Sequence, residues 1–306
     1  MKHFGKSSFW FLSLSYLLVC VSLSSCGESP GVRSIKQESL YDRVIRAGKI
    51  RCAYFIYPPY SVKDPNSGKI NGVGTDALQL VADKLGLKLE IVEEVGWGNM
   101  VEGLQTNRYD IVASPVWTNA NRARVAGFSK PLFYSPIFAY IKKGNHRLPN
   151  RLEKLNSPDV TIATIDGETA QVIAESEIPK AKKLSMPQMT DCSQMLLNVA
   201  TGKADLTFME PTLAYLYMKN NPNSLEPLEG GRPIRLFPNC WMFRRGEYEF
   251  KAMLDTVLDE VINSGEMDRI IAKYELAPNL IYRVASPFRQ PLSLQTANKS
   301  GSTLAQ

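Results

Sequence analysis

The sequence predicts an α/β fold made of two similar lobes, and three observations support this prediction. Apolar runs typical of strands alternate with segments whose apolar residues follow helical spacing, as in parallel β-α-β units. This pattern occurs twice, over about 50–113 and again over about 160–208. The chain has 306 residues, which is roughly twice the common domain size of about 150.

The first copy of the pattern begins after a polar stretch. We expect a helix over 40–47 that ends at Gly48, a strand over 50–55, a helix capped by Thr75 and Asp76 and ended by Gly86, a strand over 87–92, a helix from Met100 to Leu104, and a strand over 111–113. Ser114 follows the last of these strands. In open α/β sheets ligands bind beyond the carboxyl ends of strands, so Ser114 is a candidate site residue.

The second copy repeats this order. We expect a strand over 160–164, a helix opening at 167–170, a helix over 195–200 and a strand over 206–208. The last third of the chain has an apolar stretch at 236–243, followed by expected helices over 250–262 and 267–274. Glu210 follows a strand as Ser114 does and is a second candidate. The composition of residues 283–306 predicts a disordered tail.

The first 25 residues have the pattern of a secretory signal peptide. Lys2 and Lys6 precede an apolar run over 9–23, which is shorter than the about 20 apolar residues of a membrane span. A retained N-terminal anchor is the alternative. Leu23-Ser-Ser-Cys26 resembles a bacterial lipobox, which implies a lipid on Cys26, a tether over 26–37, and an exported protein held at the periplasmic or extracellular face of a membrane.

Composition argues against several classes of function. His3 and His146 are the two histidines and are not at ligand spacing, and neither a P-loop nor a C-x-x-C motif occurs, so we expect no metal and no cofactor. The net charge of +6 comes without a basic stripe, so we expect no nucleic acid partner. Of the remaining cysteines, Cys52 and Cys240 could form a disulfide, but we favour three isolated buried thiols with Cys192.

Four side chains together suit a zwitterionic ligand. The Arg122 guanidinium matches a carboxylate, the Glu210 carboxylate matches an ammonium, and Tyr57 and Trp97 offer aromatic faces for the ligand's side chain. Taken singly, each is more commonly a solvated or a structural residue.

A family resemblance extends over about residues 40–278. The chain resembles the extracellular solute-binding proteins of polar amino acid ABC transporters in Gly48-x-Ile50, Tyr57-Pro-Pro-Tyr60, Gly68-Lys-Ile-Asn-Gly72-x-x-x-Asp76, Leu85-Gly86-x-Lys88, Trp97, Arg122-x-x-x-Ala126-x-Phe128-Ser129, Gly167-Glu-Thr169, Gly202-Lys-Ala-Asp205, Asn263-Ser-Gly265 and Ile271-Ala-Lys-Tyr274. The resemblance implies a type II periplasmic-binding fold with two hinge strands, lobe 1 at 38–134 plus 239–282, and lobe 2 at 135–238. It also implies a monomer that delivers an amino acid to an ABC transporter permease.

The resemblance assigns roles to the candidate residues. Arg122 would clamp the ligand's α-carboxylate with help from the backbone near Ser114 and from Thr169. Glu210 stands where the family usually has an Asp for the α-ammonium, while Tyr57 and Trp97 would enclose the side chain. The chain departs from the family pattern at Thr118, which lies four residues before Arg122 instead of three, and at Val116, where a small hydroxyl residue or Gly is common.

Two other functions compete with this prediction. An enzyme of the cyclohexadienyl dehydratase type could use the same fold, with Glu210 as its general acid; the lipobox favours the binding protein. The sensor region of a signalling protein would need a later membrane span or output domain, and we identify neither. Tyr57 and Trp97 suit a cationic or an aromatic ligand side chain.

Overall fold

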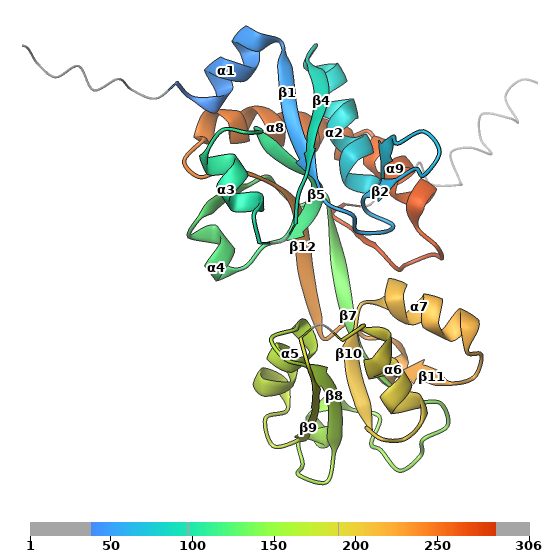
Figure 1. Ribbon diagram of the computed structural model, residues 1–306. Coiled ribbons are helices and arrows are strands. Elements are labelled where there is room, and N and C mark those ends of the chain that lie inside the picture. Colours follow the sequence, from blue (N-terminus) through green and yellow to red (C-terminus); the bar gives the residue numbers. More distant parts are fainter. Residues whose placement is uncertain (1–37, 97, 189, 286–306) are drawn as a thin grey trace, which may run out of the picture. The chain divides into compact units, whose positions relative to one another are not determined.

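Two lobes with separate cores make up the residues that the computed structural model describes, which are 38–96, 98–188 and 190–285. All of these belong to one unit, which begins at Glu38. The core of one lobe uses buried residues between Ile137 and Leu228. The core of the other uses residues 40–133 and 241–281, so this lobe is built from two stretches of chain (Figure 1). The predicted two-lobe α/β fold is confirmed.

The strands of both lobes join one mixed sheet, in the order β4-β1-β5-β12-β7-β10-β8-β9, with β6 on β12 and with β11 and β13 on β7. The described strands are β1 (Lys49–Tyr54), β2 (Val62–Lys63), β3 (Ile70–Asn71), β4 (Lys88–Glu94), β5 (Ile111–Trp117), β6 (Ala126–Phe128), β7 (Phe133–Lys142), β8 (Thr161–Ile165), β9 (Lys182–Met186), β10 (Leu206–Met209), β11 (Leu225–Pro227), β12 (Arg235–Arg244) and β13 (Tyr282–Arg283). Strands β2 and β3 form a separate hairpin.

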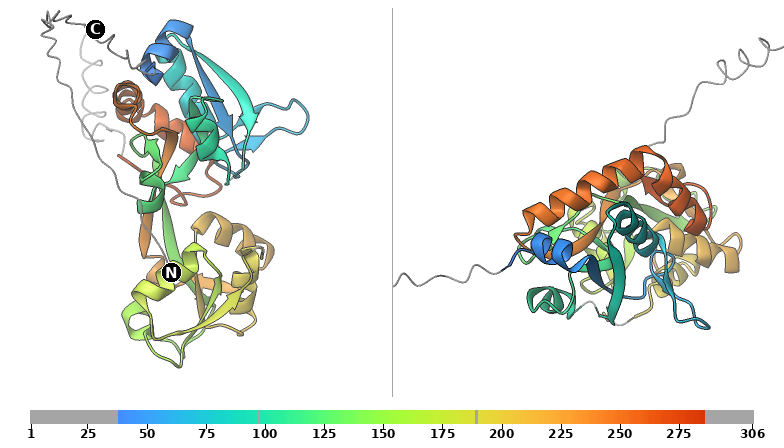
Figure 2. Two further views of the ribbon diagram at one scale, coloured as in Figure 1. Left: turned by 60° about the vertical axis from the view of Figure 1, so that its left-hand side comes forward. Right: turned by 90° about the horizontal axis from the view of Figure 1, so that it is seen from above.

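The helices cover the faces of this sheet. They are α1 (Leu40–Ala47), α2 (Val73–Lys84), α3 (Met100–Gln105), α4 (Ala120–Ala123), α5 (Thr169–Glu177), α6 (Ser193–Ala200), α7 (Pro211–Asn220), α8 (Tyr248–Asn263) and α9 (Glu266–Tyr274), with short 3-10 turns at Leu152–Leu155 and Leu228–Gly230. Helix α8 lies beside α1, α2 and α9 (Figure 2). The bounds of α1 follow from local signals: the Ser39 hydroxyl caps its first turn, and Gly48 ends it at φ 63°.

Alternating side chains divide the first lobe's core between the two faces of its sheet. Cys52, Ile111 and Phe243 pack with α1, α2 and α8 on one face. Their neighbours Ala53 and Val112 pack with α3 on the other. Because successive strand residues point to opposite faces, both faces are apolar and both are covered.

Strands β7 and β12 connect the two lobes and are the predicted hinge strands. They pair antiparallel from Arg235↔Ile137 to Asn239↔Phe133. Strand β12 continues against β5 in the first lobe, and β7 continues against β10 in the second. Figure 1 shows both strands passing from one core to the other.

The structure differs from the sequence prediction at three element ends. Helix α2 begins at Val73 after Gly72, and not at a cap formed by Thr75 and Asp76. A Cβ at Gly72 would lie 2.4 Å from the Tyr60 carbonyl oxygen, so the close approach of this loop sets the start of the helix. Strand β5 continues to Trp117, so Ser114 lies inside it. The disordered tail is expected from residue 283, but Arg283 lies in β13 and forms ion pairs with Asp268 and Glu275. Residues 286–306 of the expected tail lie outside the described residues.

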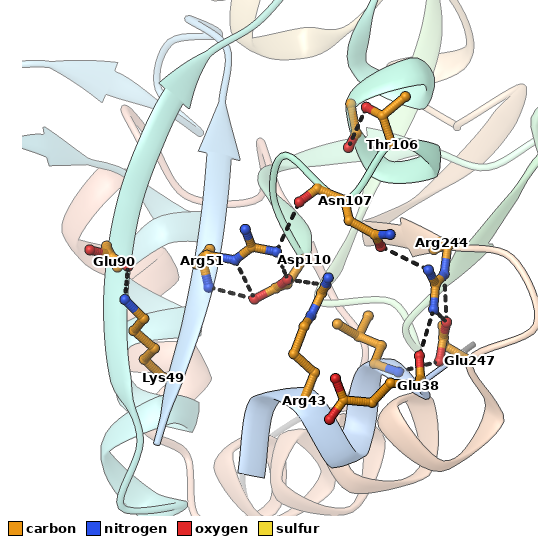
Figure 3. Close-up of polar contacts among 12 residues, drawn as sticks. Glu38, Arg43, Lys49, Arg51, Glu90, Thr106, Asn107, Asp110, Arg244 and Glu247 are labelled. Atoms are coloured by element: carbon orange, nitrogen blue, oxygen red, sulfur yellow. Dashed lines mark hydrogen bonds and ion pairs between the residues drawn. The ribbon is translucent and has the colours of Figure 1, made fainter. Parts of the chain in front are cut away.

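A cluster of charged side chains fastens α1 to the amino ends of β1 and β5 (Figure 3). Asp110 is 2% exposed and forms ion pairs with Arg43 and with Arg51, whose Nη2 lies 2.8 Å from its Oδ1. The Leu40 backbone N–H donates to Glu247, which is ion-paired with Arg244. This cluster lies at the end of the strands opposite to the candidate site residues, and we interpret it as structural.

Candidate ligand-binding site

The candidate residues follow the carboxyl ends of strands in both lobes. Tyr57 lies three residues after β1, and Arg122 lies in α4, after β5. Thr169 is the first residue of α5, after β8, and Glu210 comes directly after β10. Strands β1 and β5 are parallel, as are β8 and β10, so each pair brings its two candidates to one edge of the sheet.

Glu210 is buried between hydroxyl groups of both lobes. Its side chain is 4% exposed, and its backbone precedes Pro211 at the start of α7. Glu210 Oε1 accepts a hydrogen bond of 2.6 Å from Tyr60 Oη, and Oε2 accepts one of 3.1 Å from Tyr57 Oη. Burial raises the pKa of Glu210, and hydrogen bonds from Ser135, Tyr60 and Tyr57 offset part of this effect.

The two tyrosines form an aromatic group at the first lobe's edge. The ring centroids of Tyr57 and Tyr60 are 5.0 Å apart, and Tyr60 stacks on Phe133 at the same distance. Burial, followed by the nearby Glu210, raises the pKa of both phenols well above 10, so both stay protonated and donate. Tyr60 is not among the candidate residues predicted from the sequence, although it ends the segment Tyr57-Pro-Pro-Tyr60.

The hinge strands contribute two polar residues that are also not among the candidates predicted from the sequence. Ser135 of β7 and Asn239 of β12 are both fully buried, and Asn239 Nδ2 donates to Ser135 Oγ at 2.9 Å. Ser135 in turn provides a hydrogen bond to Glu210 that offsets part of the rise in pKa caused by burial. The Glu210 carboxyl is therefore linked to both strands that join the lobes.

Arg122 is half-buried and held by its own loop. Its backbone N–H donates to Asn119 Oδ1 at 2.9 Å, and its Nη1 donates to the Trp117 carbonyl at 2.6 Å. Burial lowers the pKa of Arg122, but an arginine remains charged at neutral pH. A partly desolvated guanidinium at a strand end is well suited to an anionic group.

The Ser114 hydroxyl is hydrogen-bonded within the first lobe, and we interpret its role as structural. The Oγ donates to the Phe55 carbonyl at 2.8 Å, accepts from the Phe55 N–H at 2.9 Å, and lies 2.9 Å from Ser61 Oγ. These contacts hold the chain after β1 against β5, so a contribution of Ser114 to a ligand would come from the backbone. Thr169 is half-buried, and Trp97 lies outside the described residues.

The order and geometry of these elements agree with a known family. The model of the bacterial extracellular solute-binding proteins, family 3, matches residues 50–277. The chain belongs to this family.

Relatives of this solute-binding protein include binding proteins and an enzyme. Cyclohexadienyl dehydratase of Pseudomonas aeruginosa is 28% identical over 83% of this chain and 91% of its own length. The L-cystine-binding protein TcyA of Bacillus subtilis is 24% identical over 86% and 96%. A solved ancestral cationic amino acid solute-binding protein is 26% identical, with a TM-score of 0.60, over 77% of this chain and 99% of its own. This similarity agrees with the predicted type II fold.

The three thiols in the described part of this solute-binding protein are not bridged. Cys52, Cys192 and Cys240 are all free, which agrees with the prediction of isolated thiols. Cys52 and Cys240 are buried as predicted, whereas Cys192 is half-buried. Within 38–285, leaving aside 97 and 189, no three acidic, histidine or cysteine side chains gather as a metal would require. In the same residues no helix has the length and apolar character needed to cross a membrane.

Proposed function

We propose that this protein binds an amino acid between its lobes and delivers it to the permease of an ABC importer. The observation that carries the proposal is the position of Glu210: a buried carboxyl of the second lobe that is reached by Tyr57 and Tyr60 of the first. A ligand bound at this point would contact both lobes. Because it would interact more strongly with the closed arrangement, it would favour closure.

The proposed roles follow the chemistry of each side chain. Arg122 would bind the ligand's α-carboxylate, together with the backbone near Ser114 and the Thr169 hydroxyl. Glu210 would bind the α-ammonium, and Tyr57 and Trp97 would flank the side chain. The relatives named for L-cystine and for cationic amino acids support a ligand of this class.

A ligand screen tests the proposal directly. The unfolding temperature of the purified protein is measured with each of the common L-amino acids and with L-cystine. A ligand at about 100 times its Kd adds about 2.7 kcal/mol of stability, which is readily detected. We expect one amino acid, or one group of similar ones, to raise the unfolding temperature, and the absence of any shift would reject the proposal.

We also propose export and a lipid anchor at Cys26, with the monomeric protein held at the outer face of a membrane. Cys26 and the signal-like residues 1–25 lie outside the described residues, so this proposal rests on Leu23-Ser-Ser-Cys26 and on the family's extracellular character. In cells, Cys26→Ser should move the protein from the membrane fraction to the soluble fraction. Equal membrane association of both forms would count against the anchor.

A dehydratase is the second candidate function, and one observation favours it. Burial raises the pKa of Glu210, which is what a carboxylic general acid needs at neutral pH. The relative named cyclohexadienyl dehydratase supports the same possibility. Incubation with prephenate distinguishes the two functions: turnover that Glu210→Gln abolishes would establish the enzyme, and an unchanged substrate would leave the binding protein.

A further inference from the structure

Glu210 differs from the other buried acids of the described residues in having no cationic partner. Asp110, Glu247 and Asp255 are also buried, but each forms an ion pair. Asp110 pairs with Arg43 and Arg51, Glu247 pairs with Arg244, and Asp255 pairs with Lys251. Glu210 has none, although it is as deeply buried. Its charge is therefore not balanced by the protein.

The groups that face Glu210 from each neighbouring element are neutral. The segment after β1 contributes the hydroxyls of Tyr57 and Tyr60, and Tyr60 Oη also lies 3.5 Å from Thr212 Oγ1 of α7. Strand β7 contributes Ser135 and the phenol of Tyr140, whose pKa is raised by burial and, to a smaller extent, by the nearby Glu210. At the start of α6, the Cys192 thiol lies close enough to Tyr57 to add a small contribution to the rise in the pKa of Tyr57 that burial and Glu210 cause.

A buried carboxylate in neutral surroundings has two ways to avoid an unbalanced charge. It can take up a proton, or it can pair with a cation that comes from outside the chain. The three hydroxyl donors stabilise the charged form in part but supply no positive charge. The same carboxyl can thus hold a proton when the site is empty and an ammonium when it is filled.

We propose that Glu210 exchanges a proton for the ammonium group of the ligand. This inference rests on the proposed function and adds to it that binding releases a proton. The O–H bond of the Glu210 carboxyl breaks, its proton passes to solvent, and the carboxylate pairs with the ligand's ammonium, while no bond of the ligand changes. Below the pKa of the empty site, affinity for such a ligand should fall about tenfold for each unit of pH.

Titration of the empty protein tests the first half of the inference without any ligand. Carbon-13 NMR of protein labelled at the glutamate δ-carboxyls follows each carboxyl, and Glu210→Gln identifies the Glu210 signal. We expect this signal to titrate above the ordinary value of 4.5, and the Glu94 signal, identified by Glu94→Gln, to titrate below it. Glu94 is a matched control because it also accepts a tyrosine hydroxyl, from Tyr54, but is exposed and ion-paired with Lys63. An ordinary or lowered value at Glu210 would overturn the inference and leave the binding function intact.

Calorimetry tests the second half with L-arginine as the probe. Below the Glu210 pKa, binding should release up to about one proton, seen as a dependence of the binding enthalpy on the buffer's ionisation enthalpy. Glu94→Gln should release as many protons as the wild type, and Glu210→Gln none. Binding without proton release, or equal release by Glu210→Gln, would overturn the exchange. If L-arginine does not bind, the amino acid that raises the unfolding temperature in the ligand screen replaces it as the probe, with the same expected and contrary results. If no amino acid binds, the proposed function fails, and the NMR titration alone then decides whether Glu210 holds a proton.

Discussion

Tyr60 Oη donates a 2.6 Å hydrogen bond to Glu210 Oε1 across 150 positions of the sequence. Tyr60 belongs to the first lobe's core and is fixed there by stacking on Phe133, whereas Glu210 begins a helix of the second lobe. The contact therefore makes the position of an acid in one lobe depend on a ring in the other. A residue with this role positions Glu210 without needing to touch the ligand.

Replacing Tyr60 by Phe tests this role. The variant keeps the ring and its stacking but loses the hydroxyl that stabilises the charged form of Glu210. Hydrogen bonds to charged groups contribute about 1.5–3 kcal/mol, so we expect the affinity for L-arginine at pH 7 to fall about tenfold or more. Calorimetry measures this change. Tyr54→Phe, which removes a similar bond to the exposed Glu94, serves as the control, and equal affinities of the two variants would contradict the role of Tyr60.

Replacing Arg122 by Ala should abolish measurable binding of the amino acid. The ligand's carboxylate would then be desolvated without its bidentate partner, and an unsatisfied charged group costs several kcal/mol. Arg124→Ala is the matched control, because this exposed arginine lies two residues further along the same segment. Calorimetry that shows near-normal affinity for Arg122→Ala would remove Arg122 from the site.

Local signals predicted the parts of the fold that local interactions determine. Helix α1 begins and ends as expected because Ser39 and Gly48 act within its own turns. The predicted start of α2 is wrong because a contact between two segments determines it: the Tyr60 backbone comes close to Gly72. The extent of β5 beyond Ser114 was missed because its last residues pair with Asn239 and Cys240, far along the chain.

The candidate site shows the same division. Glu210 could be found because it directly follows an apolar strand and precedes a proline. Ser135 and Asn239 could not be found, since a serine and an asparagine within apolar strands carry no local sign of a shared network. Their relation to Glu210 arises from the pairing of β7 with β12. The binding of the ligand's α-carboxylate by Arg122 and Thr169, which the family resemblance implies, stays a proposal.

Removal of the buried acid at the other end of the first lobe should affect stability and leave binding unchanged. Asp110→Asn would leave Arg43 and Arg51 without their shared carboxylate, and breaking a buried ion pair costs about 3 kcal/mol or more. Urea unfolding should show this loss, and the affinity for L-arginine should not change. Asp83→Asn, at an exposed acid hydrogen-bonded to Gln79, should unfold like the wild type. A stable Asp110→Asn would show that this cluster does not fasten α1.

Cys192 should be the thiol that reacts first among the three that the structure describes. Burial raises the pKa of Cys52 and of Cys240 to about 12, so both should resist alkylation until the protein unfolds. Cys192 is half-exposed, and burial raises its pKa too, so iodoacetamide should label it slowly at pH 7 and faster at pH 9. Peptide mass spectrometry identifies the site, and Cys192→Ser is the control. Because Cys192 lies near Tyr57, bound L-arginine should slow the reaction; labelling of Cys52 or Cys240 first would contradict the burial argument.

The pH dependence of stability should show the buried charge of Glu210 in the absence of ligand. Because the pKa of Glu210 is raised in the folded state, its contribution to stability is fully present below the ordinary value of 4.5 and is lost as pH rises through the raised value. Each unit by which the pKa is raised corresponds to about 1.4 kcal/mol. The free energy of unfolding of the wild type should therefore fall relative to that of Glu210→Gln as the pH rises above 4.5.

Urea unfolding of wild type and variants at several pH values measures this difference. Glu94→Gln provides a control of opposite sign, because hydrogen bonds from Tyr54 and Lys63 lower the pKa of Glu94. The contribution of Glu94 to stability is therefore present at neutral pH and is lost as the pH falls through the lowered pKa. If the difference in the free energy of unfolding between wild type and Glu210→Gln stays constant with pH, Glu210 has the same pKa in the folded and the unfolded state. The hydroxyls of Tyr57, Tyr60 and Ser135 would then balance its burial by themselves.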